Sequence, residues 1–369
     1  MNTSINLSDL DLRIAIIITG GRTGSDFFQS LTDGHPEILQ FPGKFLFDEF
    51  WNLINSDNSN NYISELFCNE YSYFFNSQLN TIERLHQLGE DKNKFFTVDL
   101  VLFKVSFCEL MDKYLFSKSA ILYCLHIAYY VAAGFQIRDK KLLILHLHDY
   151  LRLEVMKDLE CEILYFLRDP IKNLQSGVEG RLRYKEDKSL SYSWYIYYLN
   201  RLVNGLEITA SFGKKTFVIQ LEKIHKNHKK LMDEFCDHFE IRYDRSLETT
   251  SYHGLKWWGD MLSEKFQNGV NPNFQNHIDL HKFFKSELYL LERALKPQLK
   301  FYNYPLRSIN SYSNILSLLP FRYELIIWWI KIRECRINEI IKIPVHWIRR
   351  IRIINKKKKK SYNYPPSIG

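Results

Sequence analysis

The chain contains few cysteines, and none of them forms a C-x-x-C pair with another. We interpret the six as buried or incidental thiols of a protein from a reducing compartment. The start of the chain shows no basic-then-apolar signal peptide, and no apolar run is long enough to cross a bilayer, so we expect a cytoplasmic protein. The cysteines are Cys68, Cys108, Cys124, Cys161, Cys236 and Cys335.

Familiar nucleotide- and metal-binding patterns are also missing. The chain has no glycine loop ending in Gly-Lys-Ser/Thr, no G-x-G-x-x-G, and no Ser/Thr-plus-Asp pattern for magnesium, which disfavours a phosphotransferase. His277 and His281 stand four residues apart on an expected helix, but no third ligand has motif spacing. We therefore expect no bound metal and a solvated helix face at these histidines.

A glycine turn near the start of the chain follows a buried strand. Residues 14–18 (Ile-Ala-Ile-Ile-Ile) form the continuous apolar run expected of a central parallel strand covered on both faces. The glycines of residues 20–24 allow a tight turn around Arg22, and Ser25 or Asp26 can cap a helix that follows. Free N–H groups at that helix start favour a bound phosphate or sulfate; a merely structural turn is the alternative.

A second apolar run, about 145 residues later, ends in an arginine. Residues 162–167 predict a strand, Arg168 leaves its end, and Pro170 stops the strand and begins a helix. Ser176 lies eight residues after the arginine. An arginine fork and a hydroxyl commonly hold a phosphate, whereas an ion pair of Arg168 with Asp169 or a surface carboxylate is the alternative. Together the two segments predict a crevice for a ligand with two separate anionic ends.

These segments resemble motifs of the sulfotransferases that use 3′-phosphoadenosine-5′-phosphosulfate (PAPS). The family's 5′-phosphosulfate loop, Arg/Lys-Ser-Gly-Thr-Thr, corresponds to residues 22–26 (Arg-Thr-Gly-Ser-Asp), and residues 35–37 (His-Pro-Glu) match its downstream D-x-H-P. The family's 3′-phosphate element is Arg-Asp-Pro followed by a serine eight residues beyond the arginine. Arg168 and Ser176 match it in residue type and spacing. The resemblance spans roughly residues 12–260. It implies an α/β, P-loop-like fold of three layers, with a central parallel sheet flanked by helices.

The resemblance also implies PAPS as the cofactor, no metal, and a set of binding residues. Arg22 would stabilise the leaving phosphate while the sulfuryl group passes in line to a hydroxyl or amine. Asp26 departs from the pattern, because the family's threonine donates a hydroxyl there and a carboxylate repels the sulfuryl group unless it caps the helix or binds substrate. The implied cofactor-binding residues of this turn and the second segment are Gly21, Arg22, Thr23, Gly24, Ser25, Asp26, Arg168 and Ser176.

Transfer to a hydroxyl or amine also requires a base. Residues 141–149 predict a strand, and His146 lies twenty-two residues before Arg168, which resembles the spacing of a catalytic histidine in cytosolic sulfotransferases. The lysine of that motif is missing, since Ile144 stands in its place. On a regular strand His146 and His148 share one face. A histidine pair hydrogen-bonded for packing is the alternative.

A competing base is an acid after the first helix, as the carbohydrate and tyrosylprotein branches of the family use. The glutamate expected there falls near Lys44, which is a mismatch, but Asp48 and Glu49 are close by. Both acids equally suit a solvated helix face. We rank His146 first as the catalytic base and these two acids behind it.

Two aromatic segments are candidates for covering a ligand. Residues 249–260 lie where the family carries a loop that closes over the cofactor, so Lys256 and Trp257 are expected to cover a phosphate and the adenine; a buried aromatic hinge is equally consistent. Residues 192–198 can line a sugar groove, although helical spacing more often places such side chains in a core.

The basic character of the chain belongs to its C-terminus. Residues 321–360 hold thirteen Lys/Arg and three Glu, a net +10 against +8 for the whole chain. Tryptophans, isoleucines and cations interleave there, as in helices that lie in an anionic membrane interface, and the bulky aliphatics disfavour a nucleic-acid partner. We predict a sulfotransferase-like domain, residues 1–310, and a basic, aromatic amphipathic helical tail, residues 311–369, that binds membrane loosely. A helix packed on the domain is the alternative.

Two functions remain for the chain as a whole. The first is a PAPS-dependent sulfotransferase acting on a carbohydrate, polysaccharide or glycolipid, cytoplasmic and peripheral on the inner face of the membrane. The second is a non-catalytic nucleotide-binding or adaptor protein on the same scaffold, with Asp26 as a sign of lost chemistry.

Overall fold

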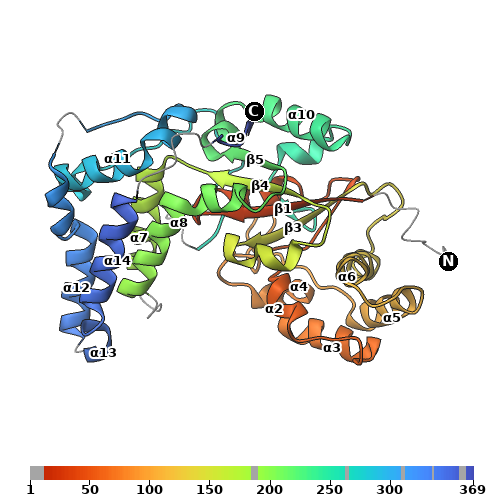
Figure 1. Ribbon diagram of the computed structural model, residues 1–369. Helices are drawn as coiled ribbons and strands as arrows, with labels where there is room; N and C mark the ends of the chain where they lie inside the picture. Colours follow the sequence, from red (N-terminus) through yellow and green to blue (C-terminus); the bar gives the residue numbers. More distant parts are fainter. Residues whose placement is uncertain (1–11, 184–189, 262–265, 309–311, 335, 357–362) are drawn as a thin grey trace.

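The protein is built around a six-stranded sheet in the order β2-β3-β1-β4-β5-β8, in which all neighbouring strands run parallel (Figure 1). The predicted α/β fold with a central parallel sheet is therefore confirmed. The strands are β1 (Arg13–Thr19), β2 (Ile38–Gln40), β3 (Leu142–His148), β4 (Glu162–Leu167), β5 (Thr216–Gln220) and β8 (Ser367–Ile368). The residues described by this computed structural model are 12–183, 190–261, 266–308, 312–334, 336–356 and 363–369.

Helices cover both faces of the sheet and extend beyond it on two sides (Figure 1). The α-helices are α1 (Ser25–Leu31), α2 (Phe47–Trp51), α3 (Asn60–Glu70), α4 (Ser72–Phe75), α5 (Leu100–Met111), α6 (Lys118–Ala132), α7 (Pro170–Arg183), α8 (Tyr192–Ala210), α9 (Leu221–Lys226), α10 (His228–Phe239), α11 (Lys285–Phe301), α12 (Arg322–Arg333), α13 (Ile337–Ile340) and α14 (Ile343–Asn355). Shorter elements are the 3₁₀ helices η2 (Ser77–Leu79), η3 (Tyr150–Met156), η4 (Arg245–Glu248), η5 (Leu280–Lys282) and η6 (Asn314–Leu318), and the hairpin of β6 (Ser251–Tyr252) and β7 (Leu255–Lys256).

Two neighbouring residues of β4 show the three layers. Phe166 faces one side, where its ring centroid lies 5.2 Å from that of Phe28 in α1, and Phe28 in turn packs on Phe235 of α10. Tyr165 faces the other side, where its hydroxyl lies close to Gly205 of α8. Because side chains alternate along a strand, α1 and α10 lie on one face of the sheet and α8 on the other. This arrangement is the one that the sequence predicted.

The helices that follow β1 and β4 begin close to the predicted positions. α7 begins at Pro170, as predicted. α1 begins at Ser25, but the prediction that Ser25 or Asp26 caps it is wrong, since Gly24 is the N-cap residue and no side chain accepts a hydrogen bond there. The Asp26 carboxylate is engaged with a cation instead, as described below.

The segment between β2 and β3 forms a lobe with an aromatic core. Phe67 packs with its ring centroid 5.3 Å from that of Phe41 and 5.4 Å from that of Phe45. His126 of α6 lies inside this core, with its ring 3.9 Å from that of Phe41 and its Nδ1 2.7 Å from the carbonyl oxygen of Leu122. Burial lowers the pKa of His126 to about 3.

The C-terminal helices pack against the rest of the molecule. Tyr192 of α8, Leu291 of α11, Ile327 of α12 and Ile354 of α14 belong to one buried apolar cluster. The helices on either side of residue 310 therefore share one core, which is the packed arrangement that the sequence allowed as an alternative to a free tail. No helix within the described part of the chain combines the length and the apolarity needed to cross a membrane.

The end of the chain also returns to the sheet. Ser367 of β8 pairs with Val218 of β5, and the carbonyl of Pro366 accepts a hydrogen bond of 2.9 Å from the Val218 N–H. β8 is thus the strand at one edge of the sheet, which the sequence did not predict. Cys335 and the lysines at 357–360 lie outside the described residues.

Stability should depend on pH through His126. The unfolded chain protonates this imidazole below about pH 6.5, whereas the folded chain resists protonation down to about pH 3, so the free energy of unfolding falls as the pH drops through this window. His126→Phe retains the ring packing and removes the titration. Between about pH 7.5 and about pH 5, the variant should lose about 2 kcal/mol less stability than the parent, measured by urea unfolding. His277→Phe, at an exposed position, should behave as the parent. Equal losses in all three proteins would contradict this account.

Candidate active site

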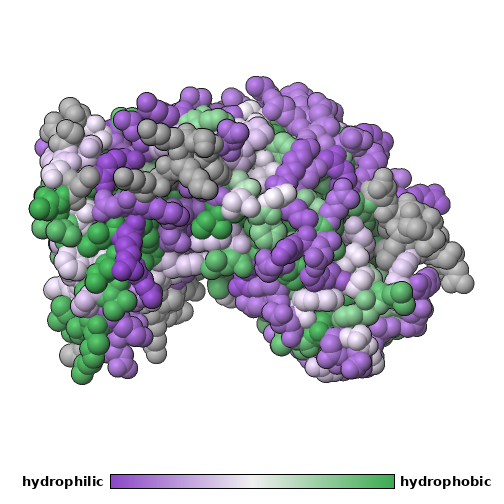
Figure 2. All heavy atoms as spheres, in the orientation of Figure 1, coloured by the Kyte–Doolittle hydropathy of each residue, from purple (hydrophilic) through white to green (hydrophobic). Residues whose placement is uncertain are grey.

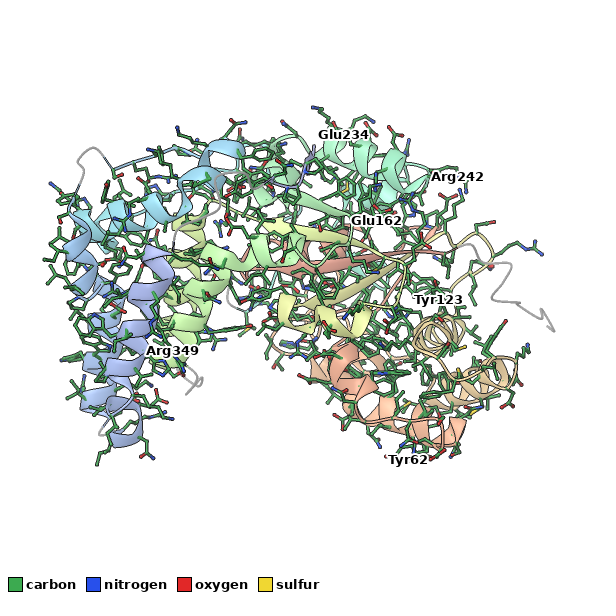
Figure 3. All side chains as sticks on the ribbon, viewed as in Figure 1. Tyr62, Tyr123, Glu162, Glu234, Arg242 and Arg349 are labelled. Atoms are coloured by element: carbon green, nitrogen blue, oxygen red, sulfur yellow. The ribbon has the colours of Figure 1, made fainter. Side chains whose placement is uncertain are left out.

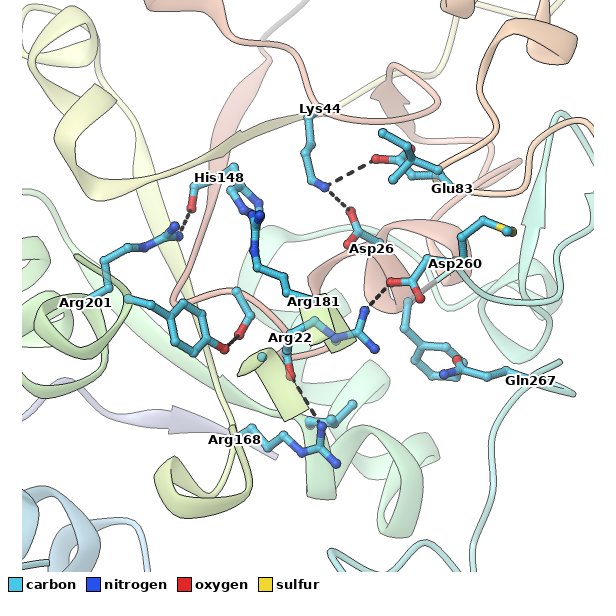
Figure 4. A pocket seen from close by; sticks show the side chains of 18 of the residues that line it. Arg22, Asp26, Lys44, Glu83, His148, Arg168, Arg181, Arg201, Asp260 and Gln267 are labelled. Carbon is cyan, nitrogen blue, oxygen red and sulfur yellow. Dashed lines mark hydrogen bonds and ion pairs between the residues drawn. The ribbon is translucent and has the colours of Figure 1, made fainter. Parts of the chain in front are cut away.

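A cavity of about 380 Å³ lies at the carboxyl ends of β1, β3 and β4 (Figure 4). In open parallel sheets this is the edge at which ligands bind. The described residues that line it are Gly21, Arg22, Gly24, Asp26, Phe27, Lys44, Ile82, Glu83, His148, Arg168, Gly177, Arg181, Trp194, Tyr198, Arg201, Leu221, His225, Trp257, Asp260, Met261, Gln267 and Phe274.

The loop between β1 and α1 forms one wall, with a backbone that favours glycine. Gly21, Arg22 and Gly24 have φ of +84°, +56° and +83°. A Cβ at Gly24 would also clash with the side chain of Leu221, so both the backbone and the packing require glycine there. Left-handed turns of this kind direct successive N–H groups to one side and create an anion-binding concavity.

Two hydroxyls of this turn that the sequence assigned to the cofactor lie away from the cavity. Thr23 and Ser25 are buried and are not among the lining residues. The Thr23 hydroxyl forms a hydrogen bond with the Thr19 hydroxyl, and Thr19 Oγ1 accepts a bond of 2.9 Å from the Gly21 N–H. The threonine hydroxyls therefore hold the turn in shape from behind.

Arg22 reaches into the cavity, as the sequence predicted. Its Nη1 lies 2.5 Å from Oδ2 of Asp260, which follows the β6–β7 hairpin (Figure 4). The ion pair connects the phosphate-type turn with the predicted covering segment, residues 249–260. Sequence reasoning singled out that segment but missed this carboxylate.

The covering segment contributes only one of its two predicted ligand contacts. Trp257 lines the cavity, and its Nε1 donates a hydrogen bond of 2.6 Å to the Glu83 carbonyl. Lys256 lies outside the cavity, with its Nζ 2.9 Å from a carboxylate oxygen of Glu90 and 4.2 Å from the ring centroid of Trp258. Lys256 is the last residue of β7 and Trp257 follows it directly, yet their side chains have different surroundings.

Arg168 leaves β4 and meets the first loop. Its Nη1 lies 3.5 Å from the carbonyl oxygen of Arg22 (Figure 4). Its Nε donates a hydrogen bond of 3.0 Å to Oδ1 of Asn276. Burial, with repulsion from Arg22, lowers the pKa of the Arg168 guanidinium. The neighbouring Asp169 pairs with Arg307 and caps α7, so the alternative of an Arg168–Asp169 ion pair is not what the structure shows.

Ser176 lies on α7, as predicted, but its neighbour lines the cavity in its place. Gly177 lies against the ring of Tyr198, and a Cβ there would come within 2.5 Å of that ring. The Tyr198 hydroxyl bonds to Asn173 and donates to the Gly21 carbonyl oxygen at 3.2 Å. Tyr198 therefore ties α7 and α8 to the β1–α1 loop.

The aromatic stretch of α8 divides between two environments. Tyr192 and Tyr195 are buried in the core, while Trp194 and Tyr198 line the cavity with their rings stacked at 5.0 Å. Arg181 of α7 lies over the Trp194 ring, 4.3 Å from its centroid. Different faces of one helix thus contribute to the core and to the cavity wall, and the sugar groove stays a prediction.

Lys44 lies between two carboxylates at the far wall of the cavity (Figure 4). Its Nζ is 3.6 Å from Asp26 and 3.4 Å from Glu83. Burial favours the neutral form of Asp26, but the charge of Lys44, with smaller contributions from His146 and Arg22, leaves its pKa below the usual value. For Glu83 burial outweighs the attraction of Lys44, and its pKa is raised.

Sequence reasoning missed Lys44 and Glu83 as site residues, although a signal was present. The two departures from the family pattern are an acid at Asp26, where a hydroxyl is usual, and a cation near the usual glutamate position, Lys44. Opposite charges at two unusual positions indicate a pair, and the structure shows that pair. Glu83 comes from a turn without any motif, so nothing in the sequence marks it.

The predicted base His146 lies behind the cavity. Its side chain has no exposed surface, and Nδ1 lies 2.8 Å from Oε1 of Gln29. A bulge shifts the register between β1 and β3, so that Ile18 pairs with His148, which has φ of +72° and lines the cavity. Burial lowers the pKa of His146 to about 4 and that of His148 well below its usual value. His146 is therefore packed behind the cavity, and the structure does not bring the predicted base to the cavity wall.

The two acids ranked behind His146 also lie outside the cavity. Asp48 and Glu49 begin α2 and both pair with Arg152, at 2.8 Å and 2.7 Å. Both carboxylates are paired at the surface of α2 and η3, and the structure does not bring them to the cavity.

No metal site was found in the part of the chain that the structure describes, where no three His, Cys, Asp or Glu side chains form a cluster suited to an ion. The expected helix carrying His277 and His281 is wrong, because His277 lies in a loop and His281 in η5.

The charged side chains lining the cavity favour an anionic ligand. Among the lining residues that the structure describes, three carboxylates, from Asp26, Glu83 and Asp260, face five cations. The cations are Arg22, Lys44, Arg168, Arg181 and Arg201. Low local dielectric strengthens their attraction for a phosphate or sulfate.

Comparisons with known proteins found similarity among solved structures. No family model and no curated protein matches the sequence. Among solved structures the chain is similar to the sulfotransferase domain from the curacin biosynthetic pathway (14% identity, TM-score 0.45, 81% of this chain and 99% of that one). It is also similar to the sulfotransferase domain of the Synechococcus PCC 7002 olefin synthase (13%, 0.43, 81% and 97%) and to sulfotransferase STF9 from Mycobacterium avium (11%, 0.39, 81% and 79%).

Proposed function

We propose that the protein is a sulfotransferase that moves a sulfuryl group from PAPS to a hydroxyl or amine of a carbohydrate or glycolipid. The observation that carries this proposal is the convergence of Arg22 and Arg168, far apart in sequence, on one cavity next to a left-handed loop. PAPS carries anionic groups at two separate positions, and two arginines beside one cavity suit such a ligand.

The residues present fit this donor. The N–H groups of residues 21–24 and the Arg22 side chain would hold the phosphosulfate, and Arg168 would hold the 3′-phosphate. Trp194 and Phe274 add aromatic side chains to the wall of the same cavity. Bound PAPS would supply an activated sulfuryl group and leave as 3′,5′-adenosine bisphosphate. Arg22 would stabilise the negative charge on the departing phosphate oxygen.

The proton of the acceptor is best taken by Glu83. Asp26 and Glu83 flank one lysine, but their environments separate their pKa values: Asp26 is held ionised, while Glu83 has the raised pKa of a general base. Glu83 would receive the proton that the acceptor gives up when the sulfuryl group is transferred to it from the bridging phosphate oxygen. Lys44 would then be freed from one carboxylate charge and could attract the sulfuryl oxygens.

The acceptor class rests on the shape and chemistry of the cavity walls. Trp194 and Tyr198 present aromatic surface beside the cations, a combination suited to a hydroxyl-rich ring, and we keep a carbohydrate, polysaccharide or glycolipid as the acceptor. We also propose that the protein acts in the cytoplasm and that it binds no nucleic acid. The alternative is a nucleotide-binding adaptor, with Asp26 as the sign of lost chemistry.

Calorimetric titration with 3′,5′-adenosine bisphosphate tests the donor site. The parent should bind, and Arg22→Ala and Arg168→Ala should each weaken binding about 10- to 100-fold, because each removes a charge-assisted contact. Lys256→Ala is the matched control, since this cation lies next to Trp257 but outside the cavity, and its affinity should equal that of the parent. A folded parent that does not bind would refute the proposal, and binding without any sulfuryl transfer would favour the adaptor.

Glu83→Gln tests the base. It should lower kcat for sulfuryl transfer by about 10²- to 10⁴-fold while the affinity for 3′,5′-adenosine bisphosphate stays near that of the parent. Because a base acts only when deprotonated, the parent's rate should fall as the pH drops below the raised pKa of Glu83, and this acid limb should vanish in the variant.

Transfer is followed as bisphosphate released from PAPS with the best acceptor from a panel of sugars and glycolipids. Glu49→Gln, outside the cavity, should keep the parental kcat. Parental kcat in Glu83→Gln, or its loss in Glu49→Gln, would contradict this assignment.

A further inference from the structure

The turn between α12 and α14 exposes large apolar side chains. Figure 1 shows this helical hairpin at one end of the molecule, with α13 at its extremity, and Figure 2 shows hydrophobic atoms there. Between 47% and 69% of each of these side-chain surfaces is exposed. We call this set the hairpin tip: Trp329, Ile332, Ile337, Ile341, Val345 and Ile348.

The tip is apolar on the face that points away from the core. α12 buries Ile327 and Lys331 and exposes Trp329 and Ile332, while α14 buries His346, Arg350 and Ile354 and exposes Val345 and Ile348. Soluble helices normally carry polar residues on the outer face. Contiguous exposed apolar surface of this kind marks an interaction site.

Exposed cations lie among these apolar side chains. Arg333 and Lys342 are exposed on either side of α13, and the Arg333 guanidinium lies 5.3 Å from the Trp329 ring centroid. Arg349 is exposed on α14, in the lower part of the helical lobe (Figure 3). Carboxylates are few by comparison, since residues 325–356 contain only Glu334 and Glu339. The surface therefore combines apolar and positive character.

A buried ion pair holds the two helices in place. Arg350 of α14 is fully buried, with Nε 3.3 Å from a carboxylate oxygen of Glu324 and Nη2 2.8 Å from the carbonyl oxygen of Leu319. Its guanidinium also lies 4.4 Å from the ring centroid of Phe321. The hairpin is thus packed as part of the domain, and its outer face is presented without rearrangement.

We propose that the hairpin tip docks on an anionic membrane surface. Side chains of Trp and Ile would enter the headgroup region while Arg333, Lys342 and Arg349 contact lipid phosphates, the pattern of a helix lying in the interface. A second copy of this chain is a poorer occupant, because the cations of two tips would face each other. A nucleic acid would leave the exposed isoleucines without apolar contact.

Vesicle co-sedimentation of the full chain tests this proposal. The parent should bind vesicles of phosphatidylcholine with phosphatidylglycerol at least tenfold more tightly than vesicles of phosphatidylcholine alone. Two double variants should each bind anionic vesicles with at least tenfold lower affinity than the parent: Ile337→Ser/Ile341→Ser and Arg333→Glu/Lys342→Glu. Leu115→Ser/Leu151→Ser, which removes exposed apolar side chains elsewhere, should bind as the parent.

Three results would overturn the proposal: a folded parent that does not bind anionic vesicles, tip variants that bind as the parent does, or a parent that forms tip-dependent dimers in analytical ultracentrifugation. Thermal unfolding of each variant confirms that it is folded. Because the tip lies apart from the cavity, nucleotide affinity should be the same in all these proteins, so failure of membrane docking and failure of the proposed function are separate results.

Discussion

The close approach of two arginines at the carboxyl edge of the sheet is the constraint on which the site depends. Arg168 reaches the carbonyl of Arg22, and burial together with the neighbouring charge lowers its pKa. Like charges in a buried place are costly unless they are compensated. Asp260 pairs with Arg22 and Asn276 accepts from Arg168, so the protein compensates them in part. A doubly anionic ligand would complete this compensation.

A second group of charges at the cavity bears on the proposed proton transfer. Lys44 is shared by Asp26 and Glu83, and only one of these carboxylates needs to remain ionised to hold it. The raised pKa of Glu83 and the lowered pKa of Asp26 show which one is the fixed partner. The acid at position 26 is therefore compatible with catalysis, because its charge is held by Lys44 and not left facing the donor.

Local patterns predicted the parts of the fold that depend on neighbouring residues. The apolar run at 14–18, the strand before Arg168 and the helix at Pro170 are all observed, because burial and proline geometry act within a few residues. The site arginines were found because each directly follows such a strand or turn. Glu83 could not be found, since only tertiary folding brings its turn to the cavity.

Other misses have equally specific causes. His146 is ranked first on its spacing from Arg168, and regular strand alternation places His148 on the same face. In the structure a bulge and a left-handed backbone turn His148 alone into the cavity. The C-terminal helices were ambiguous because one amphipathic pattern fits both a packed helix and a membrane-bound one. In the structure α14 packs on α8, with the His346 ring centroid 5.6 Å from that of Tyr192, and still exposes Val345 and Ile348.

The most direct test of the account is a crystal structure of the protein with 3′,5′-adenosine bisphosphate. We predict one phosphate on the N–H groups of residues 21–24 beside Arg22, the other against Arg168, and Glu83 facing the open end of the cavity next to the first phosphate. A nucleotide bound elsewhere, or bound here with Arg168 still occupied only by Asn276 and the Arg22 carbonyl, would contradict the central claim that the two arginines form one ligand site.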